Sequence, residues 1–165
     1  MPIPTWSVGQ VLASADVNSW FVPLFAFKAA NTSRSSTTSP TSDPDLQLAV
    51  AANGYYQLNM MVGYEGANRG TGDLQWQFSL PSGGLRYAVS MQQVSTGNGV
   101  TNWFGPGSTQ AASNGAGNGM ALNLQGLFEN GSSAGTFAFQ WAQNTSSGTP
   151  TIVYSFSYMM LRRVS

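Results

Sequence analysis

Apolar and polar residues alternate with a period of two through most of the chain, most clearly at its C-terminal end. Residues 135–142 place Phe137, Phe139 and Trp141 on one side of an extended segment. Such alternation is typical of β-strands with one face in a core. Shorter runs of the same kind precede it, at residues 46–50, 56–64, 74–80, 85–91 and 120–124. About eight strands joined by Gly- and Asn-rich turns predict an all-β fold, a jelly-roll β-sandwich.

The last run, residues 151–163, carries apolar residues on both of its sides. One side, from Ile152 to Met160, is rich in aromatic residues, and the opposite side mixes apolar residues with serines. A strand with this pattern is expected to be covered on both faces. We therefore predict that it also lines an interface between subunits, formed by Val153, Met159 and Leu161.

Residues 1–30 differ in pattern from the rest, and we expect them to form an arm with a short helix. The helix is predicted over residues 14–20, with Ser14 as its N-cap and Pro23 as its end. The arm either packs on its own domain, residues 31–165, or docks on a neighbouring protein, and the residues leave both alternatives open. Its apolar contact residues would be Trp6, Val11, Leu12, Val17, Trp20 and Phe21.

The chain carries very little charge. Charged residues make up 7% of it, against roughly 25% in ordinary soluble proteins, and six basic residues balance six acidic ones. Nucleic-acid binding depends on clustered Lys and Arg, so we expect no nucleic-acid partner. A neutral surface does not keep copies apart, which favours self-association.

Several chemistries and locations are excluded by missing residues. The chain has no Cys and no His, so thiolate nucleophiles, imidazole bases and Cys/His zinc sites cannot form. No apolar run approaches the ~20 residues that a membrane helix needs, so we expect no membrane insertion. The N-terminus lacks the pattern of a secretory signal, and we expect a protein made in the cytoplasm.

Six carboxylates remain as candidate chemistry. Asp43-Pro44-Asp45 invites a calcium site, but the ligand series of an EF-hand is absent and a turn opened by Asp-Pro is favoured. Glycosidases need two positioned carboxylates, and Glu65 and Glu129 are the only nominal pair. We therefore expect no enzyme, no catalytic residue, no bound metal and no cofactor.

Two groups of motifs resemble bacteriophage virion proteins. Residues 5–18, Thr-Trp-Ser-Val-Gly-Gln-Val-Leu-Ala-Ser-Ala-Asp-Val-Asn, resemble the G-x-V-L-T-A-x-D-x-N sequence near the start of many phage tail and virion-surface proteins. A further set of segments is similar to small structural proteins in phages of actinobacteria: residues 20–24, 43–46, 50–53, 135–147 and 161–164. The resemblance implies a non-enzymatic virion structural protein, of the decoration or minor tail type.

The succession of strands also resembles the trimeric jelly rolls of the complement C1q and tumour-necrosis-factor type, in which the last strand runs near the threefold axis. That resemblance implies a homotrimer. Closed threefold assembly would shield apolar surface and strand edges.

Together the resemblances imply a homotrimeric capsid decoration protein on the virion surface. Residues 1–30 would dock it on the major capsid protein or on tail proteins, and residues 31–165 would project. The alternative is a minor tail or tail-fibre protein that binds host cell-wall glycan. In that case Trp103 and Phe104, beside a glycine-rich loop, would stack on sugar rings.

Overall fold

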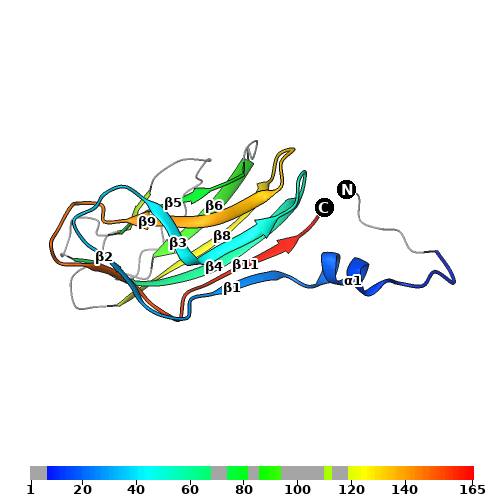
Figure 1. Ribbon diagram of the computed structural model, residues 1–165, viewed down its shortest axis with the longest axis horizontal. Helices are drawn as coiled ribbons and strands as arrows, with labels where there is room; N and C mark the ends of the chain where they lie inside the picture. The colour runs from blue at the N-terminus through cyan, green and yellow to red at the C-terminus, as the bar shows by residue number, and fades with distance from the viewer. Residues whose placement is uncertain (1–6, 68–73, 82–85, 94–109, 113–118) are drawn as a thin grey trace.

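The computed structural model describes residues 7–67, 74–81, 86–93, 110–112 and 119–165. In residues 86–93 and 110–112 only the backbone is described. These residues form two antiparallel sheets that pack face to face, preceded by helix α1 (Ser14–Phe21) (Figure 1). The predicted all-β sandwich is confirmed.

The larger sheet, sheet A, is organised around β4 (Tyr55–Glu65). On one side β4 pairs with β8 (Met120–Glu129), which in turn pairs with β6 (Arg86–Gln93). On its other side β4 pairs with β10 (Thr151–Val153) and then with β11 (Tyr158–Arg163). The short strands β2 (Thr32–Arg34) and β1 (Leu24–Phe27) lie outside β10 and β11 respectively.

The smaller sheet, sheet B, has the order β3-β9-β5-β7. Its strands are β3 (Thr41–Val50), β9 (Gly135–Ala142), β5 (Leu74–Ser79) and β7 (Gln110–Ala112). From β3 to β9 the strands alternate between the sheets along the chain, because β3, β5, β7 and β9 belong to sheet B whereas β4, β6 and β8 belong to sheet A.

The turn at Asn53-Gly54 connects the two sheets, because β3 and β4 do not pair with each other. Asn53 has a φ of 53°, in the left-handed region that Asn tolerates better than most residues. The backbone N–H of Asn53 donates to the carbonyl of Gly131 at 2.8 Å, and the N–H of Asn130 donates to the carbonyl of Gly54 at 2.8 Å. The β3–β4 and β8–β9 turns therefore hold each other in place.

Aromatic side chains fill the space between the sheets. Phe128 of β8 stacks on Phe137 of β9 with ring centroids 4.4 Å apart, so the contact joins sheet A to sheet B. Phe137 also stacks on Phe78 of β5 at 4.8 Å. Such offset contacts add to the stabilisation from apolar burial. The largest aromatic residues that are fully buried are Trp76, Trp141, Tyr64, Phe128, Phe137 and Phe139.

The final run of the chain is two strands instead of one. Residues 154–157 form a turn between β10 and β11, in which the Ser157 N–H donates to the Tyr154 carbonyl at 3.1 Å. Val153, Met159 and Leu161 are fully buried in the core of their own chain. The prediction that these three residues line a subunit interface is therefore wrong. Strands β10 and β11 both pair with the central β4, and Val153, Met159 and Leu161 lie on the side of these strands that faces sheet B.

Helix α1 is confirmed, but its cap differs from the prediction. Ala13 occupies the N-cap and makes no side-chain capping bond, so Ser14 is the first helical residue. The helix lies beyond one end of the sandwich, and residues 7–13 extend away from it (Figure 1). Among the described residues no helix is long and apolar enough to cross a membrane.

The sandwich begins earlier than residue 31. Strand β1 pairs with β11 from Leu24↔Leu161 to Phe27↔Tyr158, and Lys28 is fully buried behind it. The boundary expected at residue 30 is therefore too late by one strand.

Candidate functional site

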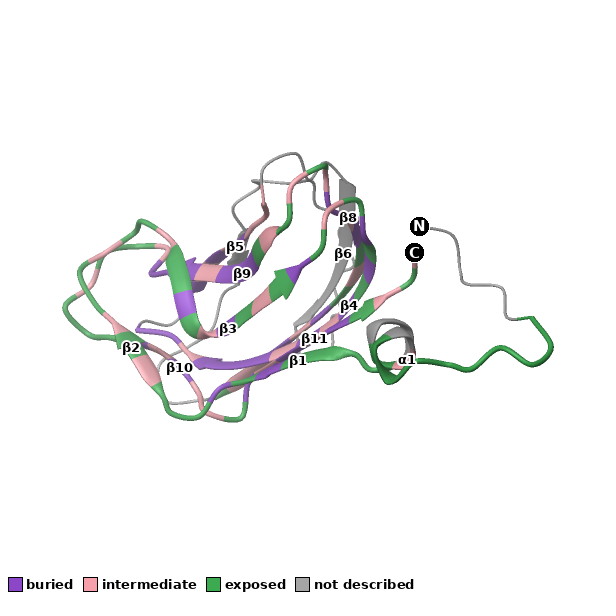
Figure 2. Ribbon diagram, turned by 45° about the vertical axis from the view of Figure 1, so that its right-hand side comes forward, coloured by how far each residue is buried: buried purple, intermediate pink, exposed green. Residues whose placement is uncertain are grey.

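The outer face of sheet A, the side turned away from sheet B, carries an exposed apolar patch. Its residues alternate with buried ones along each strand, since Ala26, Met60 and Met159 point into the core. We call this patch the apolar face and define it as the exposed Phe25, Phe27 and Phe156 together with the half-buried Met61, Tyr158 and Met160. Figure 2 shows exposed residues along β1, at the edge of this sheet.

Strand register brings the apolar face together from three strands. One cross-strand row runs from Phe27 to Tyr158 to Met61, and Phe25 lies opposite Met160 in the next row. Phe25 and Phe27 are 57% and 58% exposed. Side chains that are directly opposite on one face of a sheet are in contact distance, so the rows form a continuous surface.

The aromatic rings of the apolar face are held by one another. Phe25 stacks on Tyr158 with centroids 5.9 Å apart and an interplanar angle of 17°. The Tyr158 hydroxyl donates to Asn59 Oδ1 at 2.9 Å, which fixes the ring on the sheet. Rings fixed in this way lose little conformational freedom on binding, a property of strong interface residues.

Phe156 extends the apolar face across the β10–β11 turn. Its ring lies beside Gly63, so that a Cβ at that position would overlap it. It also stacks on Tyr154 with centroids 5.5 Å apart. The Tyr154 hydroxyl donates to a carboxylate oxygen of Glu65. That hydrogen bond, with smaller contributions from burial and from the Glu65 charge, raises the pKa of Tyr154.

None of the six residues of the apolar face is charged, and two of the described charged residues lie near its ends. Arg162 is exposed on the same side of β11, opposite Gln57, and Glu65 lies at the far end of β4. An uncharged aromatic and methionine surface with charged ends matches the composition of interface cores, where charge is depleted. The arrangement provides binding surface, with no acid–base group at its centre.

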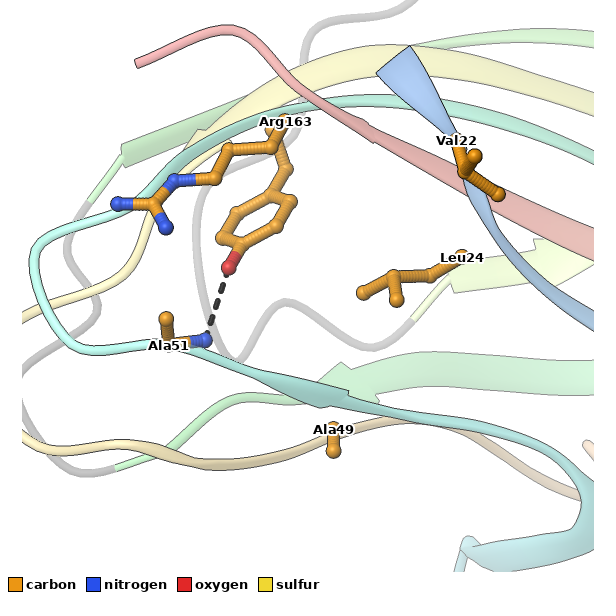
Figure 3. Close-up of a pocket in the computed structure, with 6 residues that line it drawn as sticks. Val22, Leu24, Ala49, Ala51 and Arg163 are labelled. Atoms are coloured by element: carbon orange, nitrogen blue, oxygen red, sulfur yellow. Dashed lines mark hydrogen bonds between the residues drawn. The ribbon is translucent and has the colours of Figure 1, made fainter. Parts of the chain in front are cut away.

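A second feature is a pocket of about 190 Å³ where the N-terminal segment joins the sandwich (Figure 3). It is mostly apolar, and the Tyr56 hydroxyl in its wall accepts a hydrogen bond from the Ala51 N–H at 2.8 Å. In the segment that leads to it, Val8 and Val11 are 108% and 91% exposed. Leu12 is also exposed and Val17 half-buried. The pocket is lined by Val22, Leu24, Ala49, Ala51, Tyr56 and Arg163.

A buried polar cluster joins the edges of the two sheets. Lys28 contacts both oxygens of the Asp43 carboxylate, and Asp43 also accepts hydrogen bonds from the backbone N–H groups of Asp45 and Leu46. These backbone bonds confirm the predicted Asp-Pro turn, which shifts the register of β3 against β9. The expected absence of calcium stays a prediction, although the carboxylate of Asp43 is occupied by Lys28.

Arg34 covers the outside of this cluster. Its guanidinium lies over the Trp141 ring, 4.2 Å from the centroid, and donates to the carbonyl oxygens of Thr41 and Ser42 at 2.8 and 3.0 Å. Burial lowers the pKa of Arg34, and the nearby Asp43 charge opposes that effect. The side chain thus ties β2 of sheet A to β3 and β9 of sheet B.

The two glutamates considered for glycosidase chemistry lie far apart. Glu129 pairs with Tyr55 at the start of β4, whereas Glu65 is the last residue of the same strand. A strand rises ~3.3 Å per residue, which separates the two by roughly 30 Å. The carboxylates of a glycosidase lie about 5–10 Å apart, so this pair does not form such a site.

Several of the predicted contact residues are not among those that the structure describes. Trp103, Phe104 and Trp6 lie outside the described residues, and so do the side chains of Trp20 and Phe21. Within the described part of the chain, no group of three or more acidic residues could hold a metal ion.

The sequence patterns missed Phe25, Phe27 and Met61 as surface residues. In β1 the small Ala26 stands between two phenylalanines. If Ala26 points into the core, alternation places both rings on the opposite, exposed side, and this pattern could have predicted them as surface residues.

The fold and this site define an all-β sandwich with an exposed apolar sheet face. No protein-family model matches the chain, and no curated protein sequence matches it. Among solved structures, the chain is similar to a protein in the structure of infectious bursal disease virus, Gt strain. The identity is 10% and the TM-score 0.18, over 98% of this chain and 45% of that one. The chain therefore spans less than half the length of that viral protein, and a TM-score this low identifies neither fold nor function.

Proposed function

We propose that the chain is a non-enzymatic structural protein of a bacteriophage virion, a homotrimer that decorates the particle surface. The apolar face is the observation that supports self-assembly, because soluble monomers rarely expose a contiguous apolar patch that has no partner. The phage virion setting comes from the sequence motifs of residues 5–18 and 135–147.

The strand order supports a jelly-roll fold of the kind that forms trimers. Within the seven-stranded sheet A, the series β1-β11-β4-β8 faces the four-stranded sheet B, β3-β9-β5-β7, and the antiparallel strands from β3 to β9 alternate between the two sheets along the chain. In trimeric jelly rolls of the complement C1q and tumour-necrosis-factor type, the last strand lies near the threefold axis. Here the outer side of β11 carries Tyr158 and Met160, so this side replaces the buried one as the proposed trimer contact.

Neutrality favours copies of the chain as partners of this face. The chain has a net charge of zero, so copies do not repel one another at long range. Burying the apolar face also requires no charged group to lose water, which removes the largest penalty of association.

The N-terminal segment is the proposed docking arm. Val8, Val11 and Leu12 are exposed at a point where the chain extends away from the sandwich. Apolar side chains in that position can be buried against a neighbouring protein of the particle, the major capsid protein or a tail protein. If the arm binds the assembled particle and not its free subunits, this binding stabilises the assembled state.

The test is sedimentation equilibrium of the purified full-length chain, followed by particle incorporation. We expect a trimer, and we expect that deletion of residues 2–22, which removes no strand, leaves the trimer intact but abolishes incorporation. A monomer at every concentration would overturn the trimer. Normal incorporation of the deleted chain would overturn the docking arm.

A further inference from the structure

The single lysine of this chain is buried without access to water, against two carboxylates. Lys28 Nζ lies 3.0 Å from Oδ1 and 2.9 Å from Oδ2 of Asp43, and neither side chain is exposed. Asp45 Oδ2 lies 3.3 Å from the same nitrogen, and its side chain is 32% exposed. Nζ also donates to Thr32 Oγ1 at 2.7 Å. The amino group of Lys28 thus contacts the side-chain carboxyl groups of two residues.

The Asp43 carboxyl group is held by further hydrogen-bond donors. The backbone N–H groups of Asp45 and Leu46 donate to Oδ1 at 3.0 and 3.3 Å. The Trp141 indole N–H donates to Oδ2 at 3.0 Å. Two backbone donors on Oδ1 and the indole on Oδ2 therefore distinguish the two oxygens, while Lys28 contacts both.

We propose that Lys28 and Asp43 condense after folding into an amide bond between Nζ and Cγ, with release of one water molecule. The pair is already in contact in the folded chain, which makes the reaction intramolecular and removes the entropy of encounter.

The proposed step balances with the groups present. One ammonium proton passes to Asp43 Oδ2, which leaves a neutral amine and a carboxylic acid. Nζ then forms a bond to Cγ, and the Asp45 carboxylate accepts a second proton from the nitrogen. The bond from Cγ to Oδ2 breaks, Asp45 returns its proton to the departing hydroxide, and water leaves. No oxidant, reductant or cofactor is required.

Each neighbour of Asp43 has a role in this step. The backbone N–H groups of Asp45 and Leu46 stabilise the negative charge that develops on Oδ1, as in an oxyanion hole. Trp141 orients Oδ2 as the departing oxygen. Asp43 is the bonded partner because it is fully buried and touches Nζ with both oxygens, whereas Asp45 is partly exposed and touches it with one.

The bond would fasten the edge of sheet A to the edge of sheet B. Lys28 directly follows β1, the edge strand that carries Phe25 and Phe27, and Asp43 belongs to β3 at the edge of sheet B. A covalent link between residues 28 and 43 closes a loop in the unfolded chain and so stabilises the fold. This inference goes beyond the proposed virion function and does not depend on it.

The test is the intact mass of the purified, denatured full-length chain. We expect a mass lower than that of the sequence by one water molecule, and no tryptic cleavage after residue 28. The peptide ending at Arg34 should instead be recovered joined to the peptide that begins at Ser35. Since Lys28 is the only lysine, amine-reactive reagents should then label only the N-terminus of the denatured chain.

Two variants identify the residues. Lys28→Met should have the full mass of its sequence. Asp45→Asn should slow bond formation at least tenfold while keeping the β-sheet circular dichroism spectrum. A full mass in the wild-type chain, with Lys28 reactive after denaturation, would overturn the proposal. So would a water loss that persists in Lys28→Met, because that loss would arise elsewhere in the chain.

Discussion

The ring of Phe156 occupies the space beside Gly63 in which any other residue would place its side chain. Gly63 lies in β4 and its carbonyl accepts from the Tyr154 N–H at 2.8 Å, so the turn between β10 and β11 folds over this glycine. Phe156 is 51% exposed, which leaves its ring free to turn toward solvent. We therefore expect Gly63 to affect the position of the Phe156 ring on the apolar face more than the stability of the fold.

Gly63→Ala tests that distinction. The new methyl group displaces the Phe156 ring, and we expect a loss of about 1 kcal/mol or less in the free energy of unfolding, in the range of surface changes. Because the displaced ring no longer stacks on Tyr154, we expect weaker self-association. Urea denaturation and sedimentation equilibrium measure the two effects. Phe156→Ala, which removes the ring, should weaken association to a similar extent. A large loss of stability in Gly63→Ala would show that the ring cannot turn away.

A lysine in the centre of the apolar face should prevent assembly. Met61 lies between Tyr158 and the neighbouring β8, and Met61→Lys would place three like charges in the proposed trimer contact. Like charges brought together with loss of water are strongly unfavourable, and we expect association to fall tenfold or more. Sedimentation equilibrium gives the association constant.

Gln47→Lys is the matched control, because it adds the same charge at an exposed position on the outer side of sheet B. It should assemble as the wild-type chain does. Equal association of Met61→Lys and the wild type would contradict the assignment of the interface to this face.

The sequence predicts which segments are strands better than it predicts which side of each strand is buried. In β5, Leu74, Trp76 and Phe78 alternate with polar residues, and the buried side follows directly from that pattern. In β10 and β11 both sides are apolar, so alternation cannot choose between them. The choice is made by pairing with β4, whose inner residues face sheet B, and pairing is a long-range property.

The polar cluster shows a second limit of the sequence. The local turn at Asp43 is readable, since Asp followed by Pro and Asp is a turn signal. Its partner Lys28 is fifteen positions away in a segment of apolar character, and no local pattern predicts a buried lysine there. A buried charge is tolerated only where a partner lies within contact, and that partner is supplied by packing of the two sheets.

In the Asp45→Asn background, where the proposed Lys28–Asp43 bond forms at least tenfold more slowly and Oδ2 is retained, Trp141→Phe should lower the free energy of unfolding by about 1–3 kcal/mol, because it removes a buried hydrogen-bond donor while keeping an aromatic ring. The indole N–H donates to Asp43 Oδ2 at 3.0 Å, and the pair is fully buried. Urea denaturation measures the difference in free energy of unfolding, provided that both chains show the same dependence on urea concentration.

Tyr158→Phe serves as the comparison, since it removes a hydrogen bond to Asn59 at a partly exposed site and should change stability by about 0.5 kcal/mol or less. Equal losses in the free energy of unfolding of the two variants would show that burial does not strengthen the Trp141–Asp43 hydrogen bond.

The Tyr154–Glu65 hydrogen bond should make stability depend on alkaline pH. The bond raises the pKa of Tyr154 above its ordinary value of about 10. As pH rises past that value, the unfolded chain releases this proton before the folded chain does. The contribution of Tyr154 to stability is therefore complete below pH about 10 and declines as pH rises toward the folded pKa.

Glu65→Gln removes the carboxylate, so the pKa of Tyr154 should fall toward its ordinary value and the alkaline decline should become shallower. Tyrosinate absorbance, measured as the difference between each chain and its Tyr154→Phe counterpart, isolates this one hydroxyl from the other tyrosines. Urea denaturation over the same pH range should show the matching change in stability. An ordinary pKa for Tyr154 in the wild-type chain would mean that the bond to Glu65 does not persist in solution, and the alkaline difference between the two chains should then vanish.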